Sequence, residues 1–195
     1  MTREATIERK TRETDIVLSL SIEGEGRSQC TTGIGFFDHM LELFSKHGLF
    51  DLTVQAKGDL QVDFHHTVED VGIVLGQAFA KALGDKVGIR RYGSCTVPMD
   101  EALVPSVADL SGRPYLVYEA PQPVEPIGAF SFQLVEEFLR AMATSLAMNL
   151  HVSILAGRDA HHMAEGLFKS LARALDEATT LDARVKGVPS TKGKL

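Results

Sequence analysis

The sequence predicts an α/β protein, more closely an α+β sandwich with sheet on one side and helices on the other. Short segments rich in β-branched residues alternate with longer segments whose apolar residues recur at helical spacing. The order β-β-α-β-α occurs twice along the chain, which indicates an internal duplication. A histidine doublet with a glutamate four residues after the first histidine opens the last helix of each copy, in His65-His66-Thr67-Val68-Glu69 and His161-His162-Met163-Ala164-Glu165.

The composition is that of a globular domain in a reducing compartment. The chain has 195 residues, of which 44% are hydrophobic and 24% charged, and its net charge is −6. This length is enough to bury a sizeable core, and the acidic balance argues against a nucleic-acid partner. No apolar run approaches the ~18 residues of a membrane span, and the N-terminus lacks a secretory signal. With two cysteines and no metal-type spacing between them, we expect a cytoplasmic protein.

The first copy begins with a weakly alternating segment, residues 4–12, which predicts an edge strand. Further strands are expected at 16–22, 28–32 and 49–56. A helix that begins at Gly33-Ile34-Gly35 should present Phe36, Phe37, Met40, Leu41 and Phe44 on one face and end at His47-Gly48, since glycine is a common helix end. A second helix should run from His65 to Gly84.

The second copy has expected strands at 102–110, 115–120 and 150–155, and expected helices at 132–146 and from His161 onward. A proline-rich bend occupies 121–126. The basic segment after Val185 predicts a loop that a ligand or partner orders. We therefore expect one domain over 1–195, made of two pseudo-repeats (about 1–92 and 93–186) and a tail, 187–195, that closes on substrate.

The doublets predict metal binding. Positions i and i+4 share a helix face, so His65 with Glu69, and His161 with Glu165, can hold one metal each. The middle histidines, His66 and His162, point about 100° away and would serve a different metal. A lone histidine is more often a core or surface residue, but repetition at equivalent places favours a two-metal site. Imidazole with carboxylate suits Mn, Fe, Co, Ni or Zn.

A further pair of candidate ligands comes from the first helix of each copy. His39 lies on the first of these helices, and Glu137 lies in the equivalent stretch of the second. Taken alone, each is typical of an ordinary surface residue.

Several motifs closely resemble imidazoleglycerol-phosphate dehydratase of histidine biosynthesis. They occur in the family's order and cover almost the whole chain, and the length fits the monofunctional form. The motifs are Gly35-Phe36-Phe37-Asp38-His39-Met40-Leu41, Ser45-Lys46-His47-Gly48, both histidine doublets, Leu110-Ser111-Gly112-Arg113-Pro114-Tyr115 and Pro189-Ser190-Thr191-Lys192-Gly193.

The resemblance implies a ribosomal protein S5 domain 2-like fold and two Mn(II) ions per active site, other divalent metals being possible. It also implies a homo-oligomer, an octahedral 24-mer whose sites lie at subunit interfaces. The implied metal ligands are His39, His65, His66, Glu69, Glu137, His161, His162 and Glu165. In two places the chain departs from the family pattern: Leu43 stands where the family helix carries Gln, and Glu137 where many relatives have His.

The implied activity is that of a carbon–oxygen lyase, a hydro-lyase that converts D-erythro-imidazole glycerol phosphate to imidazole acetol phosphate and water. The proton to be removed is not next to a carbonyl, so the imidazole ring must supply the driving force. Metals on both ring nitrogens would stabilise an imidazolate, which expels the hydroxyl through a diazafulvene-like intermediate. Glu13 or Glu165 would move the protons, and the sequence does not choose between them.

By the same resemblance, a set of polar side chains binds the substrate and its phosphate, as positive charge and N–H donors would. The set is Glu13, His47, Arg91, Arg113, Lys169, Ser190, Thr191 and Lys192. Two rival functions remain open from the residues alone. One is a metal-dependent hydrolase with an activated water. The other is a metal-storage or shell-forming protein, which would need neither the arginines nor the tail.

Overall fold

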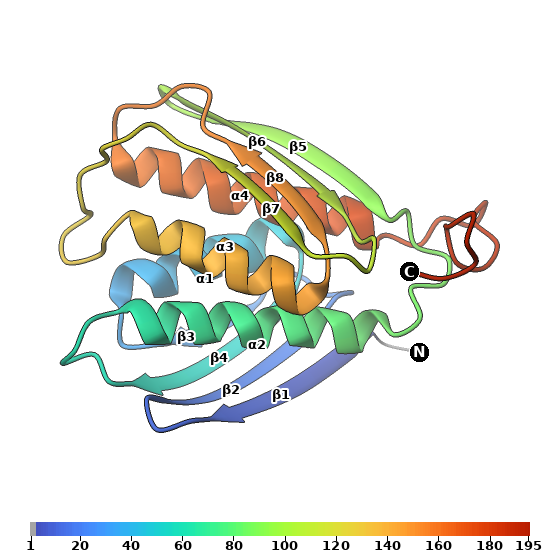
Figure 1. Ribbon diagram of the computed structural model, residues 1–195, viewed down its shortest axis with the longest axis horizontal. Coiled ribbons are helices and arrows are strands. Elements are labelled where there is room, and N and C mark those ends of the chain that lie inside the picture. Colours follow the sequence, from blue (N-terminus) through green and yellow to red (C-terminus); the bar gives the residue numbers. More distant parts are fainter. Residues whose placement is uncertain (1–2) are drawn as a thin grey trace.

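The computed structural model describes residues 3–195 as two four-stranded sheets with four helices between them (Figure 1). The first half contains β1 (Glu4–Lys10), β2 (Thr14–Ser21), β3 (Ser28–Thr31), α1 (Gly35–Gly48), β4 (Asp51–Gly58) and α2 (His65–Leu83). The second half contains β5 (Tyr92–Met99), β6 (Ala102–Asp109), β7 (Tyr115–Glu119), α3 (Gln133–Leu146), β8 (Asn149–Ser153) and α4 (Ala160–Thr179). The predicted duplicated α/β sandwich is confirmed. Each copy has three strands before its first helix, the third being the short strand β3 or β7, so the observed order is β-β-β-α-β-α.

Both sheets have the same topology. Their strand orders are β1-β2-β4-β3 and β5-β6-β8-β7. In each sheet the first three of these strands pair antiparallel and the last pair is parallel. The helices of each half lie on one face of its sheet, and the two helical layers face each other, with α1 packed on α4 and α2 on α3 (Figure 1). Helices from different halves therefore meet in the middle of the molecule.

Strand β5 was not predicted. The sequence analysis placed no strand between residues 92 and 101, because this segment contains Gly93 and Pro98 and alternates only weakly. It is an edge strand, the position that tolerates proline. A Cβ at Gly93 would lie 1.9 Å from the carbonyl oxygen of Ala174, so α4 packs directly on the strand at this glycine. The backbone of β5 thus supports the helix that carries the second histidine doublet.

Helix α1 ends at Gly48 as predicted, but the glycine does not act as the left-handed cap. Gly48 is the last helical residue, and the left-handed position belongs to Leu49, with φ 56°. The Leu49 N–H donates to the carbonyl of Ser45 and closes the helix. Gly48 has a packing role instead, because a Cβ there would lie 2.3 Å from the Phe50 ring.

The helices bury the faces that the spacing predicted. On α1, Phe37, Met40, Leu41 and Phe44 are fully buried, whereas Phe36, predicted on the same face, is only half-buried because its ring packs at the edge of the core against His161. Aromatic rings join the halves, since Phe138 of α3 lies with its centroid 5.5 Å from that of Phe37. Among residues 3–195, no helix is both long and apolar enough to cross a membrane. The shared core fixes how the helices from the two halves lie against each other.

Candidate metal centre

The contact between α1 and α4 brings three predicted metal ligands together. His39 Nε2 lies 3.2 Å and His161 Nε2 3.0 Å from the same oxygen, Oε1 of Glu165. Within residues 3–195 these three side chains are the only set of three or more His, Cys, Asp or Glu whose ligand atoms all lie within 4.8 Å of one another. The Phe36 ring packs edge-on against His161, with centroids 5.2 Å apart, and helps to hold that imidazole. One ligand thus comes from the first half and two from the second.

Glu165 is the electrostatic centre of this group. The residue is buried, and burial alone would raise its carboxyl pKa. Hydrogen bonds from Lys169, His39 and His161 outweigh burial and lower the pKa to about 2. Lys169 Nζ donates to Glu165 Oε2 at 2.6 Å, one helical turn further along α4. The carboxylate is therefore ionised at neutral pH, the form that binds a divalent cation.

His47 lies two turns beyond His39 on α1 and belongs to the same surroundings. Partial burial lowers its imidazole pKa, and the positive charges of Lys169 and Arg173 lower it further. A neutral imidazole can accept a hydrogen bond as well as donate one. This property fits a residue that binds a polar substrate.

A pseudo-equivalent group lies between α2 and α3. His65 and Glu137 line one cavity of about 400 Å³, together with Asp63 and Gln133. His65 Nε2 is 3.9 Å from Glu69 Oε2 on the same helix face. In both helix pairs, a doublet from one half therefore lies beside a candidate ligand from the other half. His39 of α1 lies beside the doublet of α4, and Glu137 of α3 lies beside the doublet of α2. This arrangement matches His39 with Glu137, as the sequence predicted.

The middle histidines do not join these groups. The ring centroids of His65 and His66 are 6.2 Å apart, and those of His161 and His162 6.4 Å. His66 Nδ1 lies 3.0 Å from Asp59 Oδ2, and His162 Nδ1 lies 2.8 Å from Glu101 Oε2. These hydrogen bonds raise the pKa of both imidazoles.

A carboxylate that accepts from Nδ1–H leaves the Nε2 lone pair free, which is the usual preparation of a histidine for metal binding. The Nε2 atom of His66 faces Glu13 Oε1 at 3.8 Å, and that of His162 faces Asp100 Oδ2 at 3.7 Å. The chemistry of the donor set, imidazole with ionised carboxylate and an outer carboxylate behind each middle histidine, fits a divalent cation such as Mn(II).

An aspartate near the start of each helix binds the backbone of the doublet. Asp159 is the N-cap of α4 and accepts hydrogen bonds from the His161 N–H at 2.7 Å and from the His162 N–H at 3.2 Å. The N-cap of α2 is Phe64, which makes no side-chain cap, and Asp63, one residue earlier, accepts a hydrogen bond from the His65 N–H at 2.8 Å. Both aspartates thus orient the first helical turn, from which the two histidines extend.

The predicted phosphate-binding residues lie elsewhere. Arg91 binds Asp109 through both Nε (2.7 Å) and Nη2 (3.1 Å), and its Nη1 donates to the carbonyl of Pro189 in the tail at 2.9 Å. The paired carboxylate raises the pKa of the Arg91 guanidinium. Arg113 is exposed; its side chain donates to the Ser111 carbonyl of its own turn, and its backbone carbonyl accepts from Asn149 Nδ2 at 2.6 Å. Ser190, Thr191 and Lys192 lie in the tail beside Arg91, with Thr191 and Lys192 exposed.

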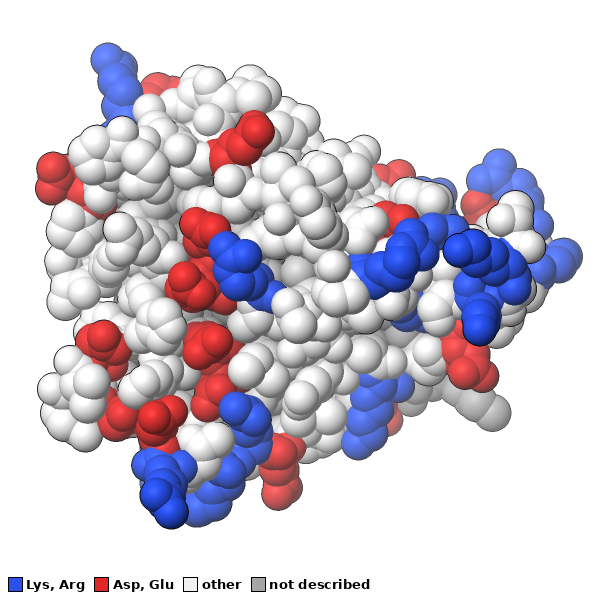
Figure 2. All heavy atoms as spheres, in the orientation of Figure 1, with Lys and Arg blue, Asp and Glu red and all other residues white. Residues whose placement is uncertain are grey.

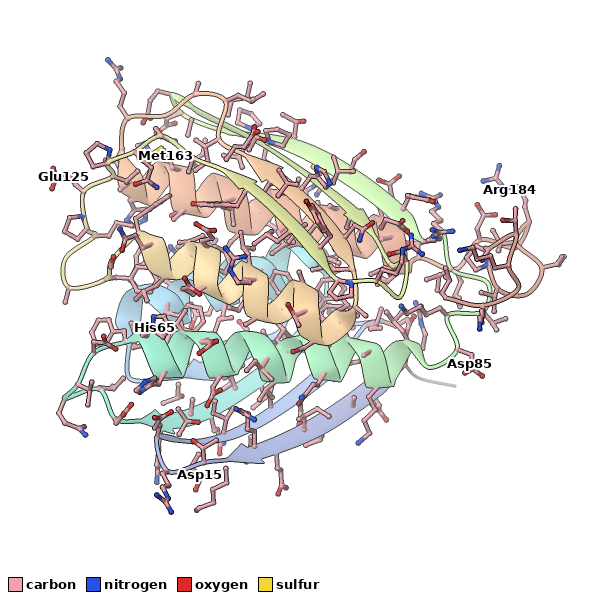
Figure 3. The ribbon with its side chains drawn as sticks, in the orientation of Figure 1. Asp15, His65, Asp85, Glu125, Met163 and Arg184 are labelled. Atoms are coloured by element: carbon pink, nitrogen blue, oxygen red, sulfur yellow. The ribbon has the colours of Figure 1, made fainter. Side chains whose placement is uncertain are left out.

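One chain does not bring the phosphate set and the doublets together. The doublets open α2 and α4 at one end of the longest axis, where His65 and Met163 are labelled, whereas the tail with Arg184 lies at the other end (Figure 3). Lys and Arg side chains gather at the tail end of the visible face (Figure 2). Three members of the predicted substrate-binding set lie near the doublets instead: Lys169 contacts Glu165, His47 lies beside Lys169, and Glu13 faces His66.

Two carboxylates of the centre, Asp59 and Glu101, were missed by the sequence analysis. Asp59 had been read as part of a turn, and Glu101 follows the unpredicted strand β5. For Asp59 a signal was available, an acidic residue in the turn that leads toward a doublet, whereas Glu101 lies in the β5–β6 turn, far from its doublet along the chain. Leu43, where the family carries Gln, packs against the core.

Comparison with known proteins agrees with this geometry. The model of the imidazoleglycerol-phosphate dehydratase family matches residues 32–175. The chain is 60% identical to the imidazoleglycerol-phosphate dehydratase of Acetivibrio thermocellus and 57% identical to that of Geobacter metallireducens, over the full length of each. Among solved structures, the enzyme from Staphylococcus aureus aligns with a TM-score of 0.83 and 38% identity over 92% of this chain and 99% of that one. The enzyme from Pyrococcus furiosus, in complex with (S)-C348, gives 0.81 and 34% over 97% and 100%.

The duplicated sandwich and its histidine–carboxylate groups define a class of protein, a carbon–oxygen lyase with an internal repeat. Sequence and structure together then identify the family. The chain belongs to the imidazoleglycerol-phosphate dehydratases, hydro-lyases that carry out a dehydration step of histidine biosynthesis.

Proposed function

We propose that this protein dehydrates D-erythro-imidazole glycerol phosphate to imidazole acetol phosphate, using two Mn(II) ions per active site. The observation that carries the proposal is the convergence of His39, His161 and Glu165 at the α1–α4 contact. One metal would be held by this set and a second by the set on α2 and α3. When bound, the metals supply Lewis acidity that stabilises negative charge on the imidazole ring of the substrate.

His66 and His162 would complete these ligand sets across subunit contacts. Their Nε2 atoms point away from the groups formed within one chain, toward Glu13 and Asp100. The separation of the doublets from Arg91 and the tail supports the same arrangement, since phosphate and ring of one substrate would then contact different subunits (Figure 3). We propose an octahedral 24-mer with active sites at its interfaces, in the cytoplasm.

For proton transfer we favour Glu13 over Glu165. Glu165 is buried and already accepts hydrogen bonds from His39, His161 and Lys169. The Glu13 side chain is 54% exposed and faces only His66 Nε2 among the described residues. A carboxylate that exchanges protons with a substrate must be accessible to it, and the exposed Glu13 side chain meets this condition. Glu165 would remain ionised as a metal ligand.

The phosphate of the substrate would be held by Arg91, Arg113 and the tail residues Ser190, Thr191 and Lys192. Arg91 is held rigidly by Asp109, so little side-chain freedom would be lost when it binds an anion. Its Nη1 already contacts the tail at Pro189, which supports closure of the tail over a phosphate at this end. His47 and Lys169 would contact the substrate near the metals.

The decisive experiment is product identification. The protein is purified, freed of metal, reloaded with Mn(II) and given imidazole glycerol phosphate. We expect a ketone product at one equivalent per substrate, detected by mass spectrometry as loss of one water, with no inorganic phosphate released. The metal-free protein should be inactive.

Other outcomes would favour the rival functions. Release of inorganic phosphate without a ketone would identify a hydrolase. Bound metal and a large particle without any turnover, with several divalent metals tried, would identify a storage or shell-forming protein. His162→Ala should lose bound metal and high-order assembly, whereas His151→Ala is the matched control, because His151 is exposed on β8 and outside every group described above.

A further inference from the structure

The two β-hairpins of the repeat carry a glutamate at equivalent positions. The strand pairing makes Leu18 of β2 equivalent to Ser106 of β6. Leu18 pairs with Val54, the fourth residue of β4, and Ser106 pairs with Val152, the fourth residue of β8. Glu13 precedes Leu18 by as many residues as Glu101 precedes Ser106, so both lie in the turn between the first two strands of their half. Each turn faces the middle histidine of its own doublet. The duplication therefore allows a direct comparison of the two carboxylates.

Three hydrogen bonds hold both oxygens of the Glu101 carboxylate. Its Oε1 accepts from the backbone N–H groups of Arg158 and Asp159, at 3.1 and 2.8 Å. Its Oε2 lies 2.8 Å from His162 Nδ1. These three hydrogen bonds, that from Asp159 above all, lower its carboxyl pKa to about 2. Glu101 thus holds the loop before α4 and orients His162.

Glu13 is held in the opposite way, by its backbone, which leaves its carboxylate available. Its N–H donates to Thr11 Oγ1 at 3.0 Å, and its carbonyl accepts from the Asp59 N–H at 3.1 Å. Asp59 also contacts His66 Nδ1, so the same turn residue touches both the histidine and the backbone of Glu13. Because Asp59 takes over the task that Glu101 performs in the second half, the Glu13 side chain is not needed there.

A buried carboxylate anchors the Glu13 turn to α2. Asp70 is only 6% exposed and accepts hydrogen bonds from Thr14 Oγ1 and from Arg9 Nε, the latter at 3.0 Å. Thr14, itself 3% exposed, directly follows Glu13. Asp70 directly follows Glu69 on α2, so the anchor links the helix of the metal ligands to the turn that carries Glu13.

The second half lacks this anchor. The hairpins make Ala102 the counterpart of Thr14, and Val97 the counterpart of Arg9. The doublets make Gly166 the counterpart of Asp70, since each lies five residues after the first histidine. A Cβ at Gly166 would lie 3.1 Å from Val104 Cγ2, so apolar contact replaces the buried hydrogen bonds. A buried charge costs stability unless it is well paired. Its presence in only the half with the free carboxylate indicates a role beyond folding.

We propose that Asp70 is a positioning residue for catalysis, which through Thr14 and Arg9 holds the Glu13 carboxylate opposite His66 Nε2. The inference rests on the proposed function, in which Glu13 moves protons. Since displacement of a reacting group by about 1 Å can cost roughly 100-fold in rate, a loosened turn would slow the chemical step without weakening substrate binding.

The test compares Thr14→Val, Thr14→Ser and Asp70→Asn in the manganese-loaded holoenzyme. Thr14→Val keeps the shape of the side chain but removes the hydrogen bond to Asp70. We expect kcat to fall about 10–100-fold with KM and manganese content unchanged, and Thr14→Ser to restore most of the rate. Hydrogen exchange at the backbone N–H groups of Glu13 and Thr14 should accelerate in Thr14→Val and Asp70→Asn, but not at Glu101.

Ser170→Ala is the control, because it removes another buried hydroxyl pair, Ser106 with Ser170 at 2.7 Å, from the second half. It should lower stability without changing kcat or exchange at Glu13. Wild-type kcat and unchanged exchange in Thr14→Val, with Glu13→Gln inactive, would overturn the positioning role and leave the proposed function intact. A wild-type enzyme that forms no ketone would instead refute the proposed function, and with it the kinetic role of Asp70.

Discussion

Glu165 is the residue on which most polar groups of the metal centre converge, with hydrogen bonds to His39, His161 and Lys169. Its removal would therefore affect the metal and the charge balance together. For Glu165→Gln we expect manganese affinity to fall by at least roughly 10–100-fold, the loss seen even for outer-sphere partners, and activity to fall with it.

Metal content after dialysis, measured by mass spectrometry, checks this expectation, with His151→Ala as the control. Full manganese content in Glu165→Gln would show that the α1–α4 group is not a metal site. Because Lys169 would then have no anionic partner, we also expect Lys169→Met to restore part of the stability of Glu165→Gln.

Asp51 gives the clearest pH dependence outside the metal centre. Hydrogen bonds from the Arg27 side chain and from the Arg27 and Glu25 N–H groups lower its carboxyl pKa to about 2. A depressed pKa stabilises the folded state above the ordinary pKa of the carboxyl group, and this contribution is lost as pH falls from about 4 toward 2. The unfolding free energy of Asp51→Asn should therefore decline less than that of the wild type over this range. Urea titrations at several pH values measure the difference, and parallel curves would contradict it.

At the residue scale, the sequence was sufficient to pair each doublet with its glutamate and insufficient to find the carboxylates behind the middle histidines. His65, His161 and their glutamates could be predicted because spacing along one helix fixes a shared face. Asp59 and Glu101 could not, because their contacts with His66 and His162 depend on how separate turns fold back onto the helices. Likewise the contact of Arg91 with Asp109 is made across a hairpin end.

The contact between α2 and α3 is the element-scale feature that matters most for the second ligand group. Gly76 lets these helices approach closely, since a Cβ there would lie 2.6 Å from the Met142 carbonyl oxygen. We expect Gly76→Ala to destabilise the protein by about 1–3 kcal/mol, as overpacking does, and to weaken metal binding by separating His65 from Glu137.

Thermal unfolding together with manganese titration tests this prediction. Gly35→Ala is the matched control, because a Cβ at Gly35 has nothing within 4 Å. It should change stability by less than about 0.5 kcal/mol. Equal behaviour of the two variants would mean that the helix contact tolerates expansion.

Helices were the best-predicted elements, because the long apolar faces of α1 and α2 give a clear period. Strand β5 escaped prediction because edge strands can carry Gly93 and Pro98, which normally argue against a strand. The sequence predicted the end of α1 at Gly48 correctly but for the wrong reason. Gly48 makes room for Phe50, and a leucine takes the left-handed position instead.

For the whole molecule, the separation of the doublets from the phosphate set predicts complementation between subunits. Arg91→Ala and Glu13→Gln should each be nearly inactive alone but should still assemble, because neither removes a metal ligand. If one active site takes Glu13 from one subunit and Arg91 from another, co-assembled mixtures should regain activity in up to about a quarter of their sites. Co-expression with two affinity tags, followed by assay of the doubly purified particle, measures the recovery. Mixed particles that stay inactive would show that each site is built within one chain.

The duplicated order could be read from the sequence, but the way in which the halves face each other could not. The repeat predicts two similar units, and only the packing of α1 on α4 and α2 on α3 shows that each unit places a candidate ligand beside the doublet of the other. Such contacts join residues far apart in the chain, and no local period encodes them.

The unequal hairpin turns have a consequence for how the chain can evolve. If the two halves were separate, identical chains encoded by one gene, every substitution would appear at both turns. A glutamate could then not be held by hydrogen bonds in one turn and be free in the other. Joining two copies in one chain gives each turn its own codon. Glu13 and Asp70 can then vary without disturbing Glu101, whose three hydrogen bonds keep the loop before α4 in place. The fused chain is thus able to be asymmetric in chemistry while it remains symmetric in fold.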